Sequence, residues 1–151
     1  MITGREAEEL FAKVMRDQGK EVRRATKKED MFDHIDFFVD DVSYDVKGHK
    51  KAERSDLDKS DRIYLEFINV HGRDGWLNGK AEYIAFLVEN EFWVTNRVEL
   101  LNYINKSLVS QKIFDNDKMY KKLYRRRFRK DVMTYVYPRD IKHLIKFKIL
   151  T

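Results

Sequence analysis

Hydrophobic residues near the start of the chain recur at the spacing of an amphipathic helix. They lie three or four positions apart, as helical side chains on one face do, and comprise Ala7, Leu10, Phe11, Val14 and Met15. Thr3 stands three residues before Glu6, which is the spacing of a capping box, and Gly19 follows as a plausible stop. The pattern therefore predicts a first helix that ends near Gly19.

Short runs of β-branched and aromatic residues follow, which is typical of strands. A short strand is predicted over 21–25, and the polar stretch 26–33 is predicted to be a loop. Two longer runs, 34–39 and 42–48, enclose a pair of aspartates. This arrangement predicts a β-hairpin.

The rest of the chain continues as a mixture of strands and helices. We predict a strand over 62–70, a hairpin over 83–95, a helix over 98–108, an irregular or helical basic stretch over 110–131, a strand over 132–137 and a closing helix from Pro138 to Ile145. No repeat or Pro/Gly linker divides the chain. We therefore expect one domain over residues 1–151, with an α/β fold in which an N-terminal helix precedes a central mixed sheet flanked by helices.

Composition narrows the class of protein. Cysteine is absent, which excludes disulfides and thiolate metal sites and is compatible with a reducing compartment. The N-terminus lacks the apolar core of a signal peptide, and no apolar run approaches the ~18 residues that span a bilayer. We expect a soluble, cytoplasmic protein with no membrane partner.

Charge is unevenly distributed along the chain. The net charge is +5, yet residues 101–151 hold 14 Lys/Arg against 4 Asp/Glu, and residues 1–100 hold 17 against 22. A basic region of this density favours a polyanion partner. The carboxylates of residues 1–100 are suited to binding divalent cations.

The second strand of the first hairpin carries the candidate chemistry. Asp45 and Lys47 are two residues apart, so in a strand they project from the same face. Asp36 lies on the neighbouring strand, near the end of the ladder. Two carboxylates together with water and phosphate oxygens suit Mg²⁺, and a metal there can polarise a phosphoryl oxygen and supply hydroxide. A simple surface ion pair between Asp45 and Lys47 is the alternative.

Asp36, followed after a short hairpin by Asp45-Val46-Lys47, resembles the motif of the PD-(D/E)XK nucleases. Gly4 and Glu8 match the glycine-to-glutamate spacing of archaeal Holliday-junction resolvases, and the resemblance covers residues 4–70. It implies a restriction-endonuclease-like core of one helix and a mixed sheet. It also implies dependence on Mg²⁺ or Mn²⁺ and hydrolysis of DNA phosphodiesters.

The resemblance also implies roles for individual residues. Asp36 and Asp45 would bind the metal, with the Val46 carbonyl as a further ligand, and Lys47 would assist the nucleophilic water. Glu8 would complete the site.

Three points qualify the resemblance: an alternative residue in the helix, a substitution in the motif and an unmatched region. Glu9 replaces Glu8 in the site if the helix is rotated by one position. Ile35 stands where the motif has proline. The region after Val70 matches no resolvase, so substrate specificity does not transfer.

Three further residues are candidates for the metal site or for nucleic-acid contact. Glu66 interrupts an apolar strand, so it either joins the metal site or orients the lysine, or else it faces solvent. Trp76 either stacks on a base or packs in the interior. Lys80, from the same glycine-rich loop, is a candidate phosphate contact.

The run from Lys121 to Lys130 is the strongest binding signal. Its apolar residues could pack while its cations contact phosphates; the cations assigned to nucleic acid are Arg125, Arg126, Arg127, Arg129 and Lys130. A solvated basic surface is the alternative interpretation.

These features together predict a metal-dependent endodeoxyribonuclease, structure-directed as a Holliday-junction resolvase is. DNA is the expected substrate, with RNA as an alternative, and a symmetric junction would call for a homodimer. A restriction or repair nuclease is a variant within the enzyme class. A catalytically inactive nucleic-acid-binding protein on the same scaffold is the alternative outside it.

Overall fold

The computed structural model describes residues 4–48, 62–108, 113, 120–125 and 127–151. Helix α1 (Gly4–Asp17) confirms the first predicted helix, with Ala7, Phe11 and Met15 buried on one face. Gly19 has φ +82°, the left-handed conformation that glycine adopts readily after a helix. The helix therefore ends where the sequence indicated.

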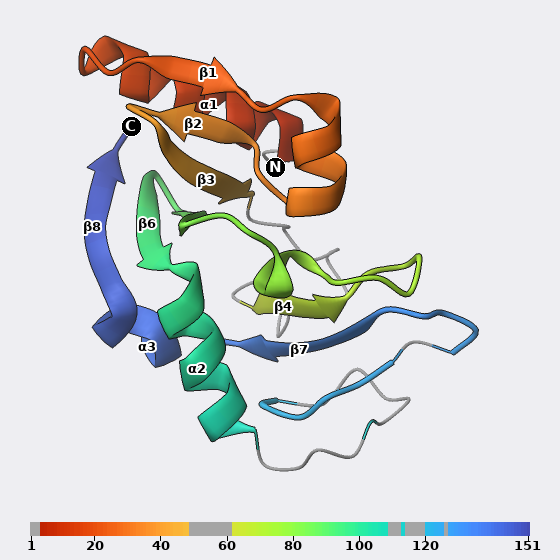
Figure 1. Ribbon diagram of the computed structural model, residues 1–151. Coiled ribbons are helices and arrows are strands. Elements are labelled where there is room, and N and C mark those ends of the chain that lie inside the picture. The colour runs from red at the N-terminus through yellow and green to blue at the C-terminus, as the bar shows by residue number, and fades with distance from the viewer. Residues whose placement is uncertain (1–3, 49–61, 109–112, 114–119, 126) are drawn as a thin grey trace.

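Six strands form a central mixed sheet. Their order is β1-β2-β3-β5-β6-β8, and their bounds are Val22–Arg24, Phe37–Val39, Val42–Lys47, Tyr83–Val88, Glu91–Asn96 and Ile145–Leu150. Every neighbouring pair is antiparallel except β3 and β5, which run parallel. Figure 1 shows α1 lying against β1, β2 and β3, and α2 and α3 near the other end of the molecule. The structure is therefore a mixed α/β fold.

Both predicted hairpins are present. Asp40 and Asp41, between β2 and β3, have φ of 48° and 66°, as a two-residue type I′ turn requires. The register pairs Phe37 with Tyr44 and Val39 with Val42. This register fixes which residues of the two strands lie opposite one another at the candidate site.

Strands β4 (Ile63–Ile68) and β7 (Val132–Val136) form a separate two-stranded antiparallel sheet. Both strands were predicted from the sequence. We expected them to belong to the central sheet, but they form a second sheet of their own. The 3₁₀ turn η3 (Trp76–Asn78) follows β4 and packs against it. This small sheet lies beside the central one and supplies further residues to the site.

Helix α2 (Arg97–Ser107) confirms the predicted second helix. The Asn96 side chain caps it by accepting a hydrogen bond from the Glu99 backbone N–H at 3.0 Å. Pro138 opens α3 (Pro138–Ile141), as the sequence indicates. A 3₁₀ turn, η4 (Lys142–Leu144), connects α3 to β8.

The structure corrects two sequence predictions and decides between two alternatives for a third. Residues 26–33 are not a loop, because they contain the π-helix η1 (Glu29–Asp33). The closing helix is shorter than predicted, because β8 begins at Ile145 and adds an edge strand to the sheet. The basic stretch 110–131 was expected to be irregular or helical, and its described part is irregular, with an antiparallel bridge between Tyr124 and Met133.

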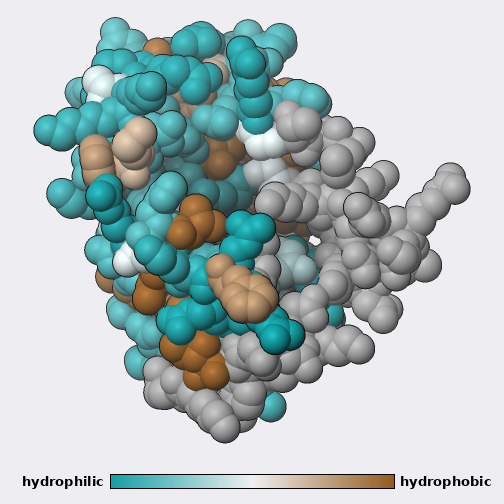
Figure 2. All heavy atoms as spheres, turned by 90° about the vertical axis from the view of Figure 1, so that its right-hand side faces the viewer, coloured by the Kyte–Doolittle hydropathy of each residue, from teal (hydrophilic) through white to brown (hydrophobic). Residues whose placement is uncertain are grey.

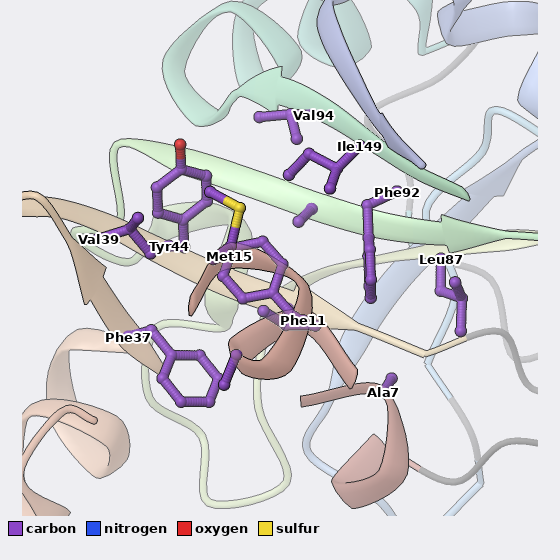
Figure 3. Close-up of a cluster of buried hydrophobic side chains, with 13 residues drawn as sticks. Ala7, Phe11, Met15, Phe37, Val39, Tyr44, Leu87, Phe92, Val94 and Ile149 are labelled. Carbon is purple, nitrogen blue, oxygen red and sulfur yellow. The ribbon is translucent and has the colours of Figure 1, made fainter. Parts of the chain in front are cut away.

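Two hydrophobic clusters cover the two faces of the central sheet. Between α1 and the sheet, the Phe11 ring lies 5.8 Å from Phe37, 5.2 Å from Tyr44 and 5.4 Å from Phe92, centroid to centroid. Figure 3 shows Phe11 and Met15 directed from α1 toward the strands. The second cluster joins η3, α2 and β4 to the opposite face. Both faces of the site hairpin are therefore packed.

The described residues contain no helix long and apolar enough to cross a membrane.

Candidate active site

The first hairpin brings Asp36 and Asp45 together. Asp36 directly precedes β2, and its backbone N–H donates to the Tyr44 carbonyl at 2.8 Å, so it continues the ladder opposite β3. One carboxylate oxygen of Asp36 accepts the Val46 backbone N–H at 2.7 Å. This bond holds the Asp36 side chain over β3, beside Asp45.

Asp45 is a buried carboxylate that is only partly satisfied. Its side chain is 4% exposed, and its Oδ1 lies 3.1 Å from the Lys47 ammonium. Its Oδ2 is buried, and none of the described residues donates a hydrogen bond to it. Burial raises the pKa of Asp45 well above its usual range against the opposing effect of Lys47, and the charge of Asp36 raises it further. Such an oxygen is stabilised by a proton or by a cation.

Lys47 lies between a carboxylate and an aromatic ring. Besides its contact with Asp45, its ammonium stands 4.8 Å from the centre of the Trp76 ring, within the range of a cation–π interaction. Trp76 is 7% exposed and packs edge-on against Phe86. Of the two interpretations of Trp76, this structure matches the one in which it packs in the interior, because the indole is buried and contacts Lys47 and Phe86.

Glu8, from the second turn of α1, is the third carboxylate of the cluster. Burial raises the pKa of Glu8 to about 7; the charge of Asp36 and a hydrogen bond with it act in the same direction, and Arg24 opposes them. The Arg24 guanidinium lies 3.6 Å from Glu8. Glu9 instead faces solvent and pairs with Arg5 at 3.4 Å. The helix rotation thus brings Glu8, and not Glu9, to the cluster.

Glu66 of β4 approaches the site from the side of Lys47. Burial raises the pKa of Glu66, while the charges of Lys47 and His34 and a hydrogen bond from the Trp76 backbone N–H lower it. Glu66 therefore lies within electrostatic range of Lys47, and its role, as a ligand of the metal or as a group that orients the lysine, stays a prediction.

Part of the site was not predicted from the sequence. A cavity of about 220 Å³ opens beside Asp36 and is lined by Arg24, Ala25, Lys27 and Asp30. Partial burial raises the pKa of Asp30, and the charge of Asp36 raises it further. Asp30 and its neighbours lie on or next to η1, and π-helical turns are frequent at functional sites.

A sequence signal for this helical turn was present. Thr26 and Glu29 have capping-box spacing, and both reciprocal bonds form: Thr26 N–H to the Glu29 carboxylate at 2.9 Å, and Glu29 N–H to the Thr26 hydroxyl at 3.2 Å. Four charged residues follow Thr26 directly, and this polar run led to the prediction of a loop in place of a helical turn.

The predicted nucleic-acid contacts lie on the surface. Lys80 is exposed, with its ammonium 3.5 Å from Asp33. Arg125, Arg127, Arg129 and Lys130 are also exposed, and Arg126 lies outside the described residues.

The oxygen donors of this cluster fit a hard divalent cation, although they do not form a closed cage. Among the described residues, no group of three or more His, Asp and Glu side chains is arranged to hold a metal ion on its own. Mg²⁺ is commonly bound by one or two carboxylates and keeps several waters. Asp36 and Asp45 could supply those carboxylates, and the Asp45 oxygen that lacks a donor is the free ligand atom.

Comparisons of this chain with protein-family models, with curated proteins and with solved structures find no match. The fold and the site nevertheless define a type of molecule: a mixed α/β domain with a carboxylate–lysine cluster at the open end of a β-hairpin. That cluster is the feature from which a function can be inferred.

Proposed function

We propose that this protein is a metal-dependent nuclease that hydrolyses phosphodiester bonds, with DNA as the substrate. The observation that carries the proposal is the cluster of Asp36, Asp45 and Lys47, in which a buried Asp45 oxygen lacks a hydrogen-bond donor. The helix and mixed sheet around the cluster agree with what the resemblance to PD-(D/E)XK nucleases implies.

Each residue has a role in this proposal. Asp36 and Asp45 would hold Mg²⁺ or Mn²⁺, and the resemblance implies the Val46 carbonyl and Glu8 as further ligands. The metal supplies Lewis-acid polarisation of the phosphoryl oxygen and an activated water. Lys47 orients that water or stabilises the developing negative charge.

Surface charge supports a polyanionic substrate. In the part of the face that is coloured in Figure 2, hydrophilic side chains predominate and hydrophobic ones are scattered among them. The exposed cations of the basic segment are Arg125, Arg127, Arg129 and Lys130. Phosphate contacts from such residues give affinity that is insensitive to base sequence.

A cleavage assay tests the proposal. Branched, duplex and single-stranded DNA are incubated with the protein and Mg²⁺, Mn²⁺ or EDTA. We expect cleavage that requires metal and that Lys47→Ala abolishes, while Lys13→Ala, which removes an exposed lysine on α1, leaves it unchanged. Binding of DNA with no cleavage of any substrate would favour the alternative, a catalytically inactive nucleic-acid-binding protein.

A further inference from the structure

Two exposed phenylalanines each lie under an arginine. Phe128 is 94% exposed, with the Arg127 guanidinium 5.1 Å from its ring centre. Phe32 is 50% exposed, with Arg73 at 5.6 Å. An aromatic ring so open to water gains little from burial in the folded chain, yet each has a cation beside it.

The backbone holds Phe128 at the tip of a turn. Tyr124 and Met133 exchange two backbone hydrogen bonds, of 2.9 and 3.1 Å, which close the segment between them into an antiparallel loop. Phe128 has φ 62° within this loop, a conformation that phenylalanine rarely adopts. Its 94% exposure shows that the ring projects into solvent from this turn.

The two phenylalanines belong to neighbouring segments. The Lys130 side chain runs so close to Gly72 that a β-carbon there would stand 3.3 Å from its Cδ, and Arg73 is the next residue. The Asp74 carbonyl contacts His34 Nε2 at 2.8 Å, directly after η1, which carries Phe32. A chain of contacts thus runs from the tip of the loop to the rim of the candidate active site. In Figure 1 the loop before β7 extends to the right-hand side, the side that faces the viewer in Figure 2.

The positive charge around Phe128 favours a partner that carries phosphate groups. Residues 120–130 contain seven Lys/Arg and no Asp/Glu. Cations beside exposed aromatic rings combine phosphate attraction with a stacking platform, the pattern used for single-stranded nucleic acid. Paired bases in a duplex offer phosphates but no free base faces.

We infer that Phe128 and Phe32, with Arg127, Arg73 and Lys130, form a binding surface for unpaired bases, so that single-stranded nucleic acid or an unpaired branch is preferred to duplex. The inference rests on the proposed function in one respect, that the substrate is nucleic acid. It adds which structural form of that substrate is recognised and which residues recognise it.

Fluorescence anisotropy tests the inference directly. A labelled single strand of about 20 nucleotides, long enough to cover one binding site, and the flush duplex of the same sequence are titrated with the full-length protein in EDTA, so that binding is measured without cleavage. We expect tighter binding of the single strand. Phe128→Ala should weaken single-strand binding about tenfold, the loss of one stacked base, and change duplex binding less than about twofold. Phe32→Ala should act in the same direction, and Phe128→Trp should retain the affinity.

Leu150→Ala is the matched control, because Leu150 is 74% exposed but lies on β8; it should change neither affinity. An equal loss on both DNAs, no loss on either, or a duplex preference in the unaltered protein would overturn the inference. So would Phe128-dependent binding to phosphatidylserine vesicles with DNA binding unchanged, since this would assign the ring to a membrane surface. Single-strand preference without metal-dependent cleavage would reject the nuclease proposal and leave this inference standing.

Discussion

Two neighbours hold the Lys47 side chain in position. Its ammonium is 3.1 Å from the Asp45 carboxylate and 4.8 Å from the centre of the Trp76 ring. The carboxylate fixes its distance from the hairpin, and the ring restricts its rotation. A lysine that aids a reaction loses effect when it is displaced by about an ångström.

The cation–π contact gives the first prediction. Replacing Trp76 by leucine removes the ring face, so we expect kcat to fall about tenfold in the cleavage assay, in line with the energy of a partly desolvated cation–π pair. Trp76→Phe retains a ring and should retain more of the activity. Equal loss in both variants, with circular dichroism showing both folded, would contradict a role for the ring itself.

Asp45 gives a prediction that separates stability from metal binding. Asp45→Asn removes a buried carboxylate whose pKa is raised by burial, so the metal-free variant should melt at or above the temperature of the unaltered protein. Mn²⁺ should raise the melting temperature of the unaltered protein but not that of the variant. The control, Asp17→Asn on the exposed end of α1, should keep the shift. A full Mn²⁺ shift in Asp45→Asn would remove Asp45 from the metal site.

Glu8 makes metal-free stability depend on pH. Its pKa rises from the ordinary value of 4.5 to about 7 in the folded protein. Between these two values the folded protein binds more protons than the unfolded chain, so the free energy of unfolding falls as pH rises. We expect Glu8→Gln to flatten this part of the profile in chemical denaturation with a chelator present. Glu9→Gln, at the exposed neighbouring position, should leave the profile unchanged.

At the scale of elements, η3 packs so closely against β4 that a side chain at Gly75 would clash with the β4 backbone. A β-carbon on Gly75 would stand 2.5 Å from the Glu66 carbonyl oxygen and 2.8 Å from its carbon, both backbone atoms of β4. The Gly75 N–H also bonds to the Phe67 carbonyl at 2.8 Å. This close approach positions Trp76 below Lys47.

Gly75→Ala should therefore lower the free energy of unfolding by about 2 kcal/mol, the usual cost of overpacking a tight interior. Urea denaturation measures it. Gly4→Ala is the matched control, because no atom of the described residues lies within 4 Å of a β-carbon at that position. A change of similar size in both variants would show that the approach to β4 is not the cause.

The elements that the sequence predicted are those set by local signals. Helix α1 has a regular apolar face and a glycine stop, and each hairpin has its turn residues between two apolar runs. The partner of β4 is β7, about half the chain away, and no local pattern specifies that pairing. Strand β8 does carry a period-two signal in Ile145, Phe147 and Ile149, but the helix predicted from Pro138 covers its first residue and no strand was predicted over the rest.

The residues of the candidate site also divide into those that local sequence signals predict and those that depend on tertiary contacts. Asp36, Asp45 and Lys47 follow from strand alternation and one hairpin, and are therefore accessible to sequence reasoning. The burial of Trp76 depends on Phe86 and on the fit of η3 against β4, which are tertiary contacts. The residues around the cavity, Arg24 and Asp30, come together only because η1 is helical, which the sequence did not lead us to expect.

At the scale of the whole molecule, the basic surface should control affinity for DNA through salt. Removing one phosphate contact lowers the slope of log K against log salt by about 0.7 to 0.9. We expect the double variant Arg125→Ala/Arg127→Ala to reduce the slope by about 1.5, measured by anisotropy between low and physiological salt. The control Lys13→Ala, whose lysine pairs with Asp17 at 2.9 Å on α1, should keep the original slope. An unchanged slope in the double variant would place the DNA surface elsewhere.

The parallel pairing of β3 with β5 also has a consequence for folding kinetics. The two hairpins and α1 involve neighbours in sequence and can form rapidly, whereas β3 meets β5 only after the whole segment between them has closed into a loop, an event that slows folding. Glu8, Asp36 and Asp45 all belong to the segment from α1 to β3, which we expect to form first. Trp76 belongs to η3, which lies in the segment that must close before β3 pairs with β5. We therefore expect the carboxylate cluster to assemble before Lys47 is fixed, so that during refolding the acquisition of metal affinity would precede the acquisition of catalytic competence.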